Sequence, residues 1–221
     1  MFNRYGDFQQ RVFGHARGVP EDRHAPSGRQ FDQACIHLVD RLAGQLNVLA
    51  QEIMRVYGGK DLTLVAVLTG SVMFIADLLR RLPIQLRLDY VGVSSYGDST
   101  RSSGDLVLTK SLKLDVRDRH VLVVDDILDS GQTMAKVRDM IARLGPCDLK
   151  FCVFIEKEIP HHNGFTADFI GFRLPDKFVV GYGLDYDDYY RNLPDLVTLT
   201  TARTPPARRM ASRSVTVPRM S

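Results

Sequence analysis

Acidic and hydroxyl side chains follow a short apolar run in the middle of the chain. Residues 121–124 read Val-Leu-Val-Val, Asp125 and Asp126 come next, and residues 129–133 read Asp-Ser-Gly-Gln-Thr. In open α/β sheets, ligands bind beyond the carboxyl ends of the strands, where the start of the next helix offers unpaired N–H groups to an anion. Two adjacent carboxylates at that place suit the vicinal hydroxyls of a sugar, directly or through a divalent cation. The stretch therefore predicts a site for a phosphorylated sugar.

A purely structural interpretation of the same stretch is a helix cap. Asp129 would then only accept hydrogen bonds from the first turn of the helix, because Ser, Thr and Asp are ordinary at that position. Three aspartates within five positions, followed by a turn that contains Gly and two hydroxyl side chains, exceed what a cap needs. Unpaired buried carboxylates are also costly, which favours a ligand site.

The elements that position these residues have a repeated strand, turn and helix pattern. A buried strand over 62–68 leads through a tight turn to a helix over 73–82, and a strand over 120–126 leads to a helix over 134–144. Such units give parallel strands joined by helices, so we expect an α/β domain. The remaining predicted elements are a helix over 42–56, strands over 84–94 and 149–155, and short strands over 168–172, 178–182 and 196–199.

The segments between and around these elements are polar or irregular. Residues 94–105 contain almost nothing that could be buried, so we expect a long mobile loop there. The region after residue 160 should be a less regular lid or side domain. Residues 1–30 and 201–221 lack periodicity and read as flexible extensions, the second one rich in arginine, which leaves 31–200 as the folded domain.

The composition is that of an ordinary folded chain. Its 221 residues allow one domain with extensions or at most two small domains, and 44% hydrophobic with 25% charged residues is typical of globular proteins. No apolar run reaches the roughly 18–20 residues of a membrane span, so we expect no membrane role. The net charge of +3 includes five arginines and no acid in 201–221, and without them it is −2. Because the basic charge is confined to that segment, we expect no nucleic-acid partner.

The cysteines and the N-terminal residues indicate the cellular compartment of the protein. Cys35, Cys147 and Cys152 form no CxxC pair, and an odd number leaves at least one free thiol. The N-terminal segment has no apolar stretch typical of a signal peptide, and its acidic residues are unlike a transit peptide. We therefore expect a cytoplasmic protein.

Residues 125–133 resemble the ribose-phosphate motif of the type I phosphoribosyltransferases. Three further segments resemble, in order and spacing, the hypoxanthine-guanine phosphoribosyltransferase family: Val-Leu-Thr-Gly-Ser at 67–71, Ser-Tyr-Gly at 95–97, and Asp-Lys-Phe-Val-Val-Gly-Tyr-Gly-Leu-Asp-Tyr at 176–186. The resemblance covers roughly 35–200. It implies an α/β fold with a parallel-sheet core, a small irregular hood and a mobile loop over the active site. It also implies transfer of a phosphoribosyl group from 5-phosphoribosyl-1-pyrophosphate to hypoxanthine or guanine, with Mg²⁺, in purine salvage.

The resemblance assigns roles to residues around the donor. Asp129 would accept or share the proton at N7 of the purine as the glycosidic bond forms. The phosphoribosyl group and its 5′-phosphate would contact Asp125, Asp126, Asp129, Ser130, Gly131, Gln132 and Thr133. The pyrophosphate would contact Leu68, Thr69, Gly70 and Arg191, and the peptide bond before the glycine is often cis in the family.

The resemblance also assigns the base, the loop and the metal. The purine would contact Lys157 through its 6-oxo group, Phe178 by stacking, the backbone of Val179, and Asp185. Ser95 and Tyr96 belong to the loop that closes over the reacting centre. The residues implied for Mg²⁺ are Asp185, Asp125 and Asp126. A homodimer or homotetramer is implied as well.

Several features leave alternatives open. Taken alone, Lys157 is an ordinary surface lysine, Phe178 a packing residue, Arg191 half of a salt bridge, and 67–71 an ordinary turn. Thr69 stands where many members have Lys or Arg, Asp125 where Glu is frequent, and Gln132 where Lys is common. The rival hypothesis is a catalytically silent nucleotide-sensing regulator on the same fold, which would lack the residues that handle the base.

Overall fold

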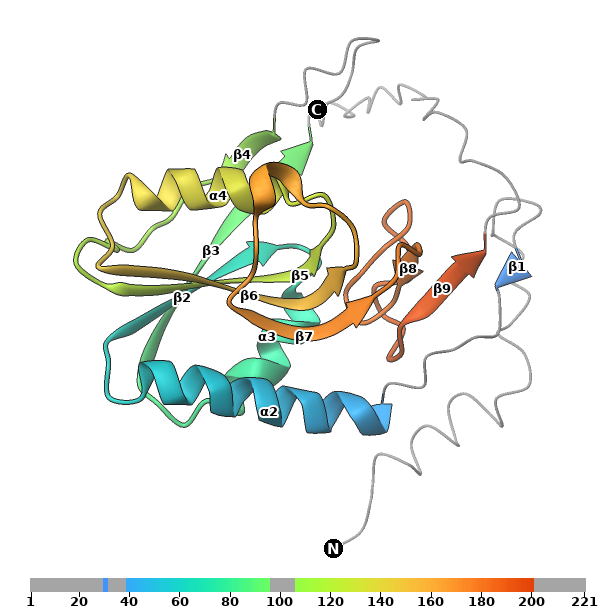
Figure 1. Ribbon diagram of the computed structural model, residues 1–221, viewed down its shortest axis with the longest axis horizontal. Helices are drawn as coiled ribbons and strands as arrows, with labels where there is room; N and C mark the ends of the chain where they lie inside the picture. Colours follow the sequence, from blue (N-terminus) through green and yellow to red (C-terminus); the bar gives the residue numbers. More distant parts are fainter. Residues whose placement is uncertain (1–29, 32–38, 96–105, 201–221) are drawn as a thin grey trace, which may run out of the picture. The chain divides into compact units, whose positions relative to one another are not determined.

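The computed structural model describes residues 30–31, 39–95 and 106–200, and Phe31–Leu199 forms one compact unit. Its centre is a six-stranded sheet in which every neighbouring pair is parallel except β3 and β4 (Figure 1). In spatial order the strands are β4 (Leu106–Lys110), β3 (Leu86–Ser95), β2 (Leu62–Leu68), β5 (His120–Leu128), β6 (Asp148–Lys157) and β7 (Phe169–Leu174). The predicted α/β class with a parallel core is confirmed.

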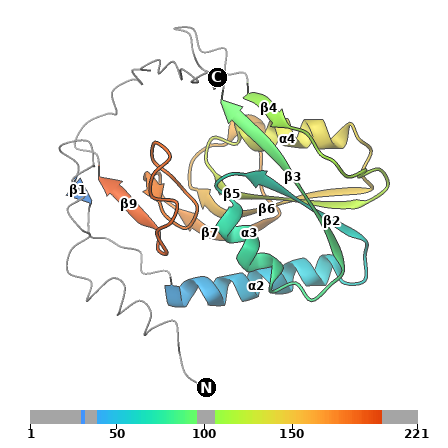
Figure 2. The same cartoon turned by 180° about the vertical axis from the view of Figure 1, so that it is seen from behind.

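Helices cover both faces of this sheet. Helices α2 (Val39–Tyr57) and α3 (Val72–Leu79) lie on one face and α4 (Gln132–Ala142) on the other (Figures 1 and 2). Alternate residues of each central strand enter one of two apolar clusters. In β2, for example, Leu64 packs with α2 and α3 and Val65 with α4. Burial on both faces explains why these strands are nearly continuous apolar runs.

Three predicted elements differ notably from the structure in extent or place, and one strand was not predicted. β5 runs two residues beyond the predicted end because its ladder with β6 continues to the pair Leu128 and Glu156. α3 ends at Leu79, before tighter backbone turns, and not at residue 82. β7 is not part of an irregular side region: it pairs with β6 and inserts Phe169 into the core. β4 was not predicted, and it extends the sheet as an antiparallel edge.

A small hood follows the main sheet. β8 (Val179–Val180) pairs antiparallel with β9 (Val197–Thr200), and the other short elements are β1 (Gln30–Phe31) and the 3-10 helix η1 (His162–Gly164). Tyr182 anchors the hood, because its hydroxyl donates to Asp77 of α3 at 2.7 Å and its ring lies 4.9 Å from that of Phe154. The pKa of Tyr182 is raised, mainly by burial and to a lesser degree by the hydrogen bond to Asp77.

The connections after β2 and β5 leave the sheet in opposite directions. These two strands are neighbours, and β2 leads to α3 on one face while β5 leads to α4 on the other. Such a switch point opens a crevice beyond the carboxyl ends of the strands, where ligands of open α/β sheets bind. The acidic stretch lies there, with Asp125 and Asp126 in the last part of β5 and Asp129 directly after the strand.

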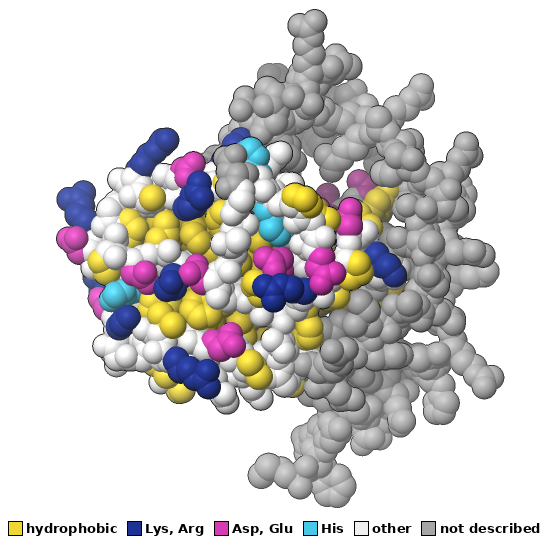
Figure 3. All heavy atoms as spheres, in the orientation of Figure 1, with side chains coloured by type: hydrophobic (Ala, Val, Ile, Leu, Met, Phe, Trp, Pro, Cys, Tyr) yellow, Lys and Arg dark blue, Asp and Glu magenta, His cyan; other side chains and the backbone are white. Residues whose placement is uncertain are grey.

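The surface of the described residues is mixed in charge. On the face drawn in Figure 3, Lys and Arg side chains lie among Asp and Glu side chains and do not form a patch of one sign. Within the described ranges, the model contains no helix with the length and apolar character needed to cross a membrane.

Candidate active site

The loops after β2 and β5 line a cavity of about 330 Å³ at the switch point. Its lining includes residues of both loops together with Asp185 and Arg191 of the hood. The loop after β2 approaches the end of β5 so closely that a Cβ on Gly70 would overlap the carboxylate of Asp126. A side chain at position 70 would therefore displace the carboxylate of Asp126.

The turn after β2 has an unusual backbone. The peptide bond between Leu68 and Thr69 is cis, a point that the sequence left open. The buried Ser71 hydroxyl donates to the carbonyl of Val67, and the carbonyl of Ser71 accepts from the N–H of Ile75 in α3. Leu68, Thr69 and Gly70 line the cavity, so the segment predicted to contact pyrophosphate reaches it.

Asp125 and Asp126 form a pair of neighbouring acids, the first buried and the second partly buried. Asp125 accepts the N–H of Asp126 at 2.9 Å, and Asp126 accepts the N–H of Ile127 at 3.0 Å. Burial raises the pKa of Asp125 well above its usual range, and the negative charge of Asp126 adds to the effect. Burial also raises the pKa of Asp126, while hydrogen bonds and the positive charge of Arg191 oppose the rise. Ligands with hydroxyl donors or a cation would relieve this desolvation.

The turn between β5 and α4 faces the same cavity. Asp129, Ser130, Gly131 and Thr133 are among its lining residues, whereas the side chain of Gln132 is exposed and is not. Gly131 occupies the N-cap position with φ +80° and gives α4 no side-chain cap. The first N–H groups of α4 are thus left to be satisfied by an anion or by water.

Lys157, at the end of β6, forms an ion pair with Asp129, the residue predicted to accept the proton of the purine. Its buried ammonium lies 3.2 Å from a carboxylate oxygen of Asp129 and 3.2 Å from one of Asp176. The lysine is therefore not the solvated surface residue of the alternative interpretation. Its second partner, Asp176, lies within the purine segment but was not singled out from the sequence.

The hood holds four further predicted residues, of which Asp185 and Arg191 line the cavity whereas Phe178 and Val179 do not. The ring of Phe178 is 47% exposed and meets Tyr186 edge-on at 5.6 Å, so it is not a core residue, while Val179 is buried. Arg191 donates to the carbonyl of Gly183 at 2.8 Å and forms an ion pair with Asp185, also at 2.8 Å. Arg191 is thus half of a salt bridge that also borders the cavity.

Comparisons with known proteins agree with this geometry. Residues 34–187 match the family model described as a phosphoribosyl transferase domain. The chain is 43% identical over 149 residues to a hypoxanthine-guanine phosphoribosyltransferase of Aquifex aeolicus, covering 67% of this chain and 84% of that protein. It belongs to the hypoxanthine-guanine phosphoribosyltransferase family.

Two other family members extend the comparison. A hypoxanthine phosphoribosyltransferase of Escherichia coli K12 is 42% identical over 136 residues, covering 62% of this chain and 76% of that protein. A crystal structure of a hypoxanthine-guanine phosphoribosyltransferase from Bacillus anthracis superposes with a TM-score of 0.71 and 32% identity, covering 78% of this chain and all of that one. The type I phosphoribosyltransferase fold is confirmed.

The resemblance assigns Ser95 and Tyr96 to the loop that closes over the active site in this family. Ser95 is the last residue of β3, and Tyr96 lies outside the described residues. The predicted loop over 94–105 is consequently described only at its first two positions, as strand. Its role in closing the family's active site stays a prediction.

The donor set of the cavity fits a magnesium ion that arrives with its substrate. Among the residues that the structure describes, no group of three or more His, Cys, Asp or Glu side chains could hold a metal ion alone. Mg²⁺ commonly binds through one or two carboxylates plus substrate phosphates and keeps several waters. Asp126 and Asp185 both line the cavity and suit that mode.

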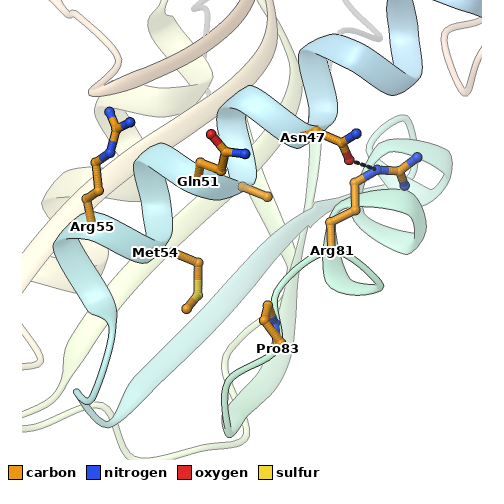
Figure 4. A pocket seen from close by; sticks show the side chains of 7 residues that line it. Asn47, Gln51, Met54, Arg55, Arg81 and Pro83 are labelled. Atoms are coloured by element: carbon orange, nitrogen blue, oxygen red, sulfur yellow. Dashed lines mark hydrogen bonds between the residues drawn. The ribbon is translucent and has the colours of Figure 1, made fainter.

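A larger hollow of about 530 Å³ lies elsewhere in the fold (Figure 4). It is lined by α2 and by Arg81 and Pro83 after α3, and Arg81 donates to Asn47 across it at 3.1 Å. These segments precede β3, so the hollow lies toward the amino end of that strand. Its lining contains no acid or nucleophile. The smaller cavity, with its carboxylates at the carboxyl ends of the strands, is the candidate active site.

Proposed function

We propose that this protein transfers the 5-phosphoribosyl group of 5-phosphoribosyl-1-pyrophosphate, the donor, to hypoxanthine or guanine. The products are IMP or GMP and pyrophosphate, and the reaction belongs to purine salvage. The contact between Lys157 and Asp129 carries the proposal, because it brings the residue suited to the base beside the residue suited to its proton. A silent regulator would have no need of this pair.

The residues around the cavity would each have a different role in the transfer. Asp125 and Asp126 would accept hydrogen bonds from the ribose hydroxyls, and residues 129–133 would hold the 5′-phosphate with their backbone N–H groups. Lys157 would donate to the 6-oxo group of the purine. Asp129 would accept the proton from N7 as N9 bonds to C1′ of the ribose. The ammonium of Lys157 lies 3.2 Å from an oxygen of this carboxylate.

Pyrophosphate is a leaving group whose negative charge must be balanced. Mg²⁺ held by Asp126 and Asp185 together with the donor would neutralise that charge. Arg191 lies beside Asp185 and would approach the same phosphates, and the loop of residues 68–70 would supply backbone contacts. Closure of the segment that contains Ser95 and Tyr96 would exclude water from the ribosyl centre.

The partners follow from this chemistry and from the surface. They are the donor and a purine base, with no nucleic acid, and we expect a reducing cytoplasm as the location. A second copy of the chain is supported by α3, which reads Val-Met-Phe-Ile-Ala-Asp-Leu-Leu and is apolar around most of its circumference. A helix of that kind is normally buried, yet Val72 and Met73 are exposed.

Exposed apolar side chains of β3 continue the argument for self-association. Leu88 and Tyr90 alternate with buried residues and lie on the sheet face that carries α3. We expect light scattering to give a homodimer or homotetramer, and Met73→Glu to shift it toward the monomer. A monomer at micromolar concentration would contradict this part of the proposal.

The decisive experiment is a spectrophotometric assay with the donor and Mg²⁺, run separately with guanine, hypoxanthine, xanthine and adenine. Guanine and hypoxanthine should react and adenine should not. Adenine presents an amino donor to the ammonium donor of Lys157, and two unpaired donors cost about 1–3 kcal/mol each. Efficient AMP formation would contradict the assigned base contact. Donor binding without turnover of any base would favour the regulator.

A further inference from the structure

We propose that His161 is a positioning residue that fixes the orientation of the phosphate turn, residues 129–131. The inference rests on the proposed function in one respect, namely that this turn binds the 5′-phosphate of the donor. His161 lies just before η1, and its side chain is only 10% exposed. No feature of the sequence motifs assigns it a role.

His161 is hydrogen-bonded to the backbone of the phosphate turn. Its Nδ1 lies 2.6 Å from the carbonyl oxygen of Asp129, and because a carbonyl only accepts, Nδ1 must carry the hydrogen. The next backbone N–H, that of residue 162, donates to the carbonyl of Ser130, also at 2.6 Å. Two successive carbonyls of the turn are therefore bound by one neighbouring segment.

Binding these carbonyls fixes the opposite ends of the same peptide groups. In a planar trans peptide, the C=O and the following N–H point in opposite directions. With the carbonyls of Asp129 and Ser130 held by the segment at His161, the N–H groups of Ser130 and Gly131 are directed to the other side of the turn. Because residues 129–131 line the cavity, that orientation suits an anion bound within it.

The turn needs an external restraint because of Gly131. A glycine at φ +80° tolerates several backbone conformations, so the peptide before it is easily rotated. The segment that binds the turn also packs against it, since a Cβ added to Gly131 would lie 3.2 Å from the Cβ of His161. Rotation of the peptide would direct a carbonyl toward the phosphate and replace an attraction by a repulsion.

The imidazole of His161 is itself held in place. Its Nε2 faces a carboxylate oxygen of Glu156 in β6 at 3.8 Å, and the other oxygen of Glu156 accepts from Arg173 of β7 at 2.8 Å. A connected series therefore runs from Arg173 through Glu156 and His161 to the peptide of Asp129. Support of this kind, from residues that do not touch the ligand, keeps binding groups in position.

The test distinguishes the contribution of Nδ1 of His161 to donor binding from that of Nε2. In His161→Asn the amide nitrogen takes nearly the position of Nδ1, whereas in His161→Gln it takes that of Nε2, and His161→Ala has neither. We expect the dissociation constant of the donor with Mg²⁺, measured by calorimetry, to rise about tenfold in the Gln and Ala variants, the usual effect of one lost hydrogen bond. The Asn variant should stay within about threefold of wild type.

His120 provides a matched control at the other end of the sheet. It is also partly buried beside a carboxylate, with Nδ1 3.9 Å from Asp148, but it lies at the start of β5. His120→Ala should lower the melting temperature without changing donor affinity. The proposal is overturned if His161→Ala binds the donor as His120→Ala does, or if the Asn variant is no better than the Gln variant. Wild-type turnover, measured first, tests the proposed function separately.

Discussion

Replacing Gly70 by alanine tests whether the two loops of the active site must touch. The new Cβ would overlap the carboxylate of Asp126, and ordinary van der Waals contact would require a shift of more than about 1 Å. That shift breaks the hydrogen bond from the N–H of Ile127, worth about 1 kcal/mol. A displacement of about 1 Å of a binding group lowers kcat/KM by roughly 10²-fold. We expect both effects in Gly70→Ala.

The measurements are thermal unfolding and steady-state kinetics with varied donor. A loss of about 1–3 kcal/mol should lower Tm by about 2–10 °C in a chain of this size. Gly44→Ala is the control: this glycine lies in α2 with nothing near its Cβ position, so alanine should stabilise the helix by about 1 kcal/mol and leave kinetics unchanged.

A double-mutant cycle decides the cause of the Gly70 effect. In Asp126→Ala the atoms that would be overlapped are absent, so adding Gly70→Ala should lower stability and kcat/KM little further. If the two changes are additive, the overlap with Asp126 is not what makes glycine necessary. The reasoning would equally fail if Gly70→Ala kept normal kcat/KM.

Three further predictions concern the acids and the C-terminal segment. Asp129→Asn should keep donor affinity and lower kcat by roughly 10²–10⁴-fold, the range for general acid-base groups, and an equal loss of donor affinity in a binding assay would assign it a structural role. Burial raises the pKa of Asp125, so the folded protein binds this proton more tightly than the unfolded chain, and stability is lost as pH rises from about 4 through the folded pKa. Asp125→Asn should therefore melt higher than wild type at pH 7 and similarly near pH 3, and a lower Tm at pH 7 would contradict the assignment. Truncation after Thr200 should leave kcat and donor KM within about twofold at ~50 and ~200 mM salt, whereas a large rise in donor KM at low salt would place that segment over the phosphates.

The parts of the fold that were predictable are those that a local pattern determines. β2 and β5 are buried on both faces, which makes them continuous apolar runs that a sequence displays directly. β4 reads Leu-Val-Leu-Thr-Lys, which is compatible with a strand, but the run is short and borders a polar segment, so it is a weaker signal than β2 or β5. The place of β7 beside β6 depends on pairing between segments, which no single-chain pattern reports.

The residues of the candidate site also fall into two groups, those that a local sequence pattern predicts and those that depend on contacts between distant segments. Asp125, Asp126 and Asp129 were predictable because parallel topology places the ends of β2 and β5 together, so a motif after either strand reaches the same cavity. Asp176 was missed because its contact with Lys157 joins two segments that are distant in the sequence. His161 was missed for a similar reason: its partner is a backbone carbonyl, and any residue has one.

Ion pairs in and beside the cavity indicate how the proposed substrates would be selected. Without substrate, the cations already have partners in the protein: Arg191 pairs with Asp185, and Lys157 pairs with Asp129 and Asp176. Phosphate gains from Arg191 by replacing the carboxylate of Asp185, whereas the ammonium of Lys157 has three N–H donors and can bind the 6-oxo group of the purine while it keeps both carboxylate partners. Pyrophosphate can compete for Arg191 because Mg²⁺ would occupy the carboxylate of Asp185 at the same time. Donor and metal would then bind together more tightly than either binds alone, because each compensates the charge that the other leaves unpaired.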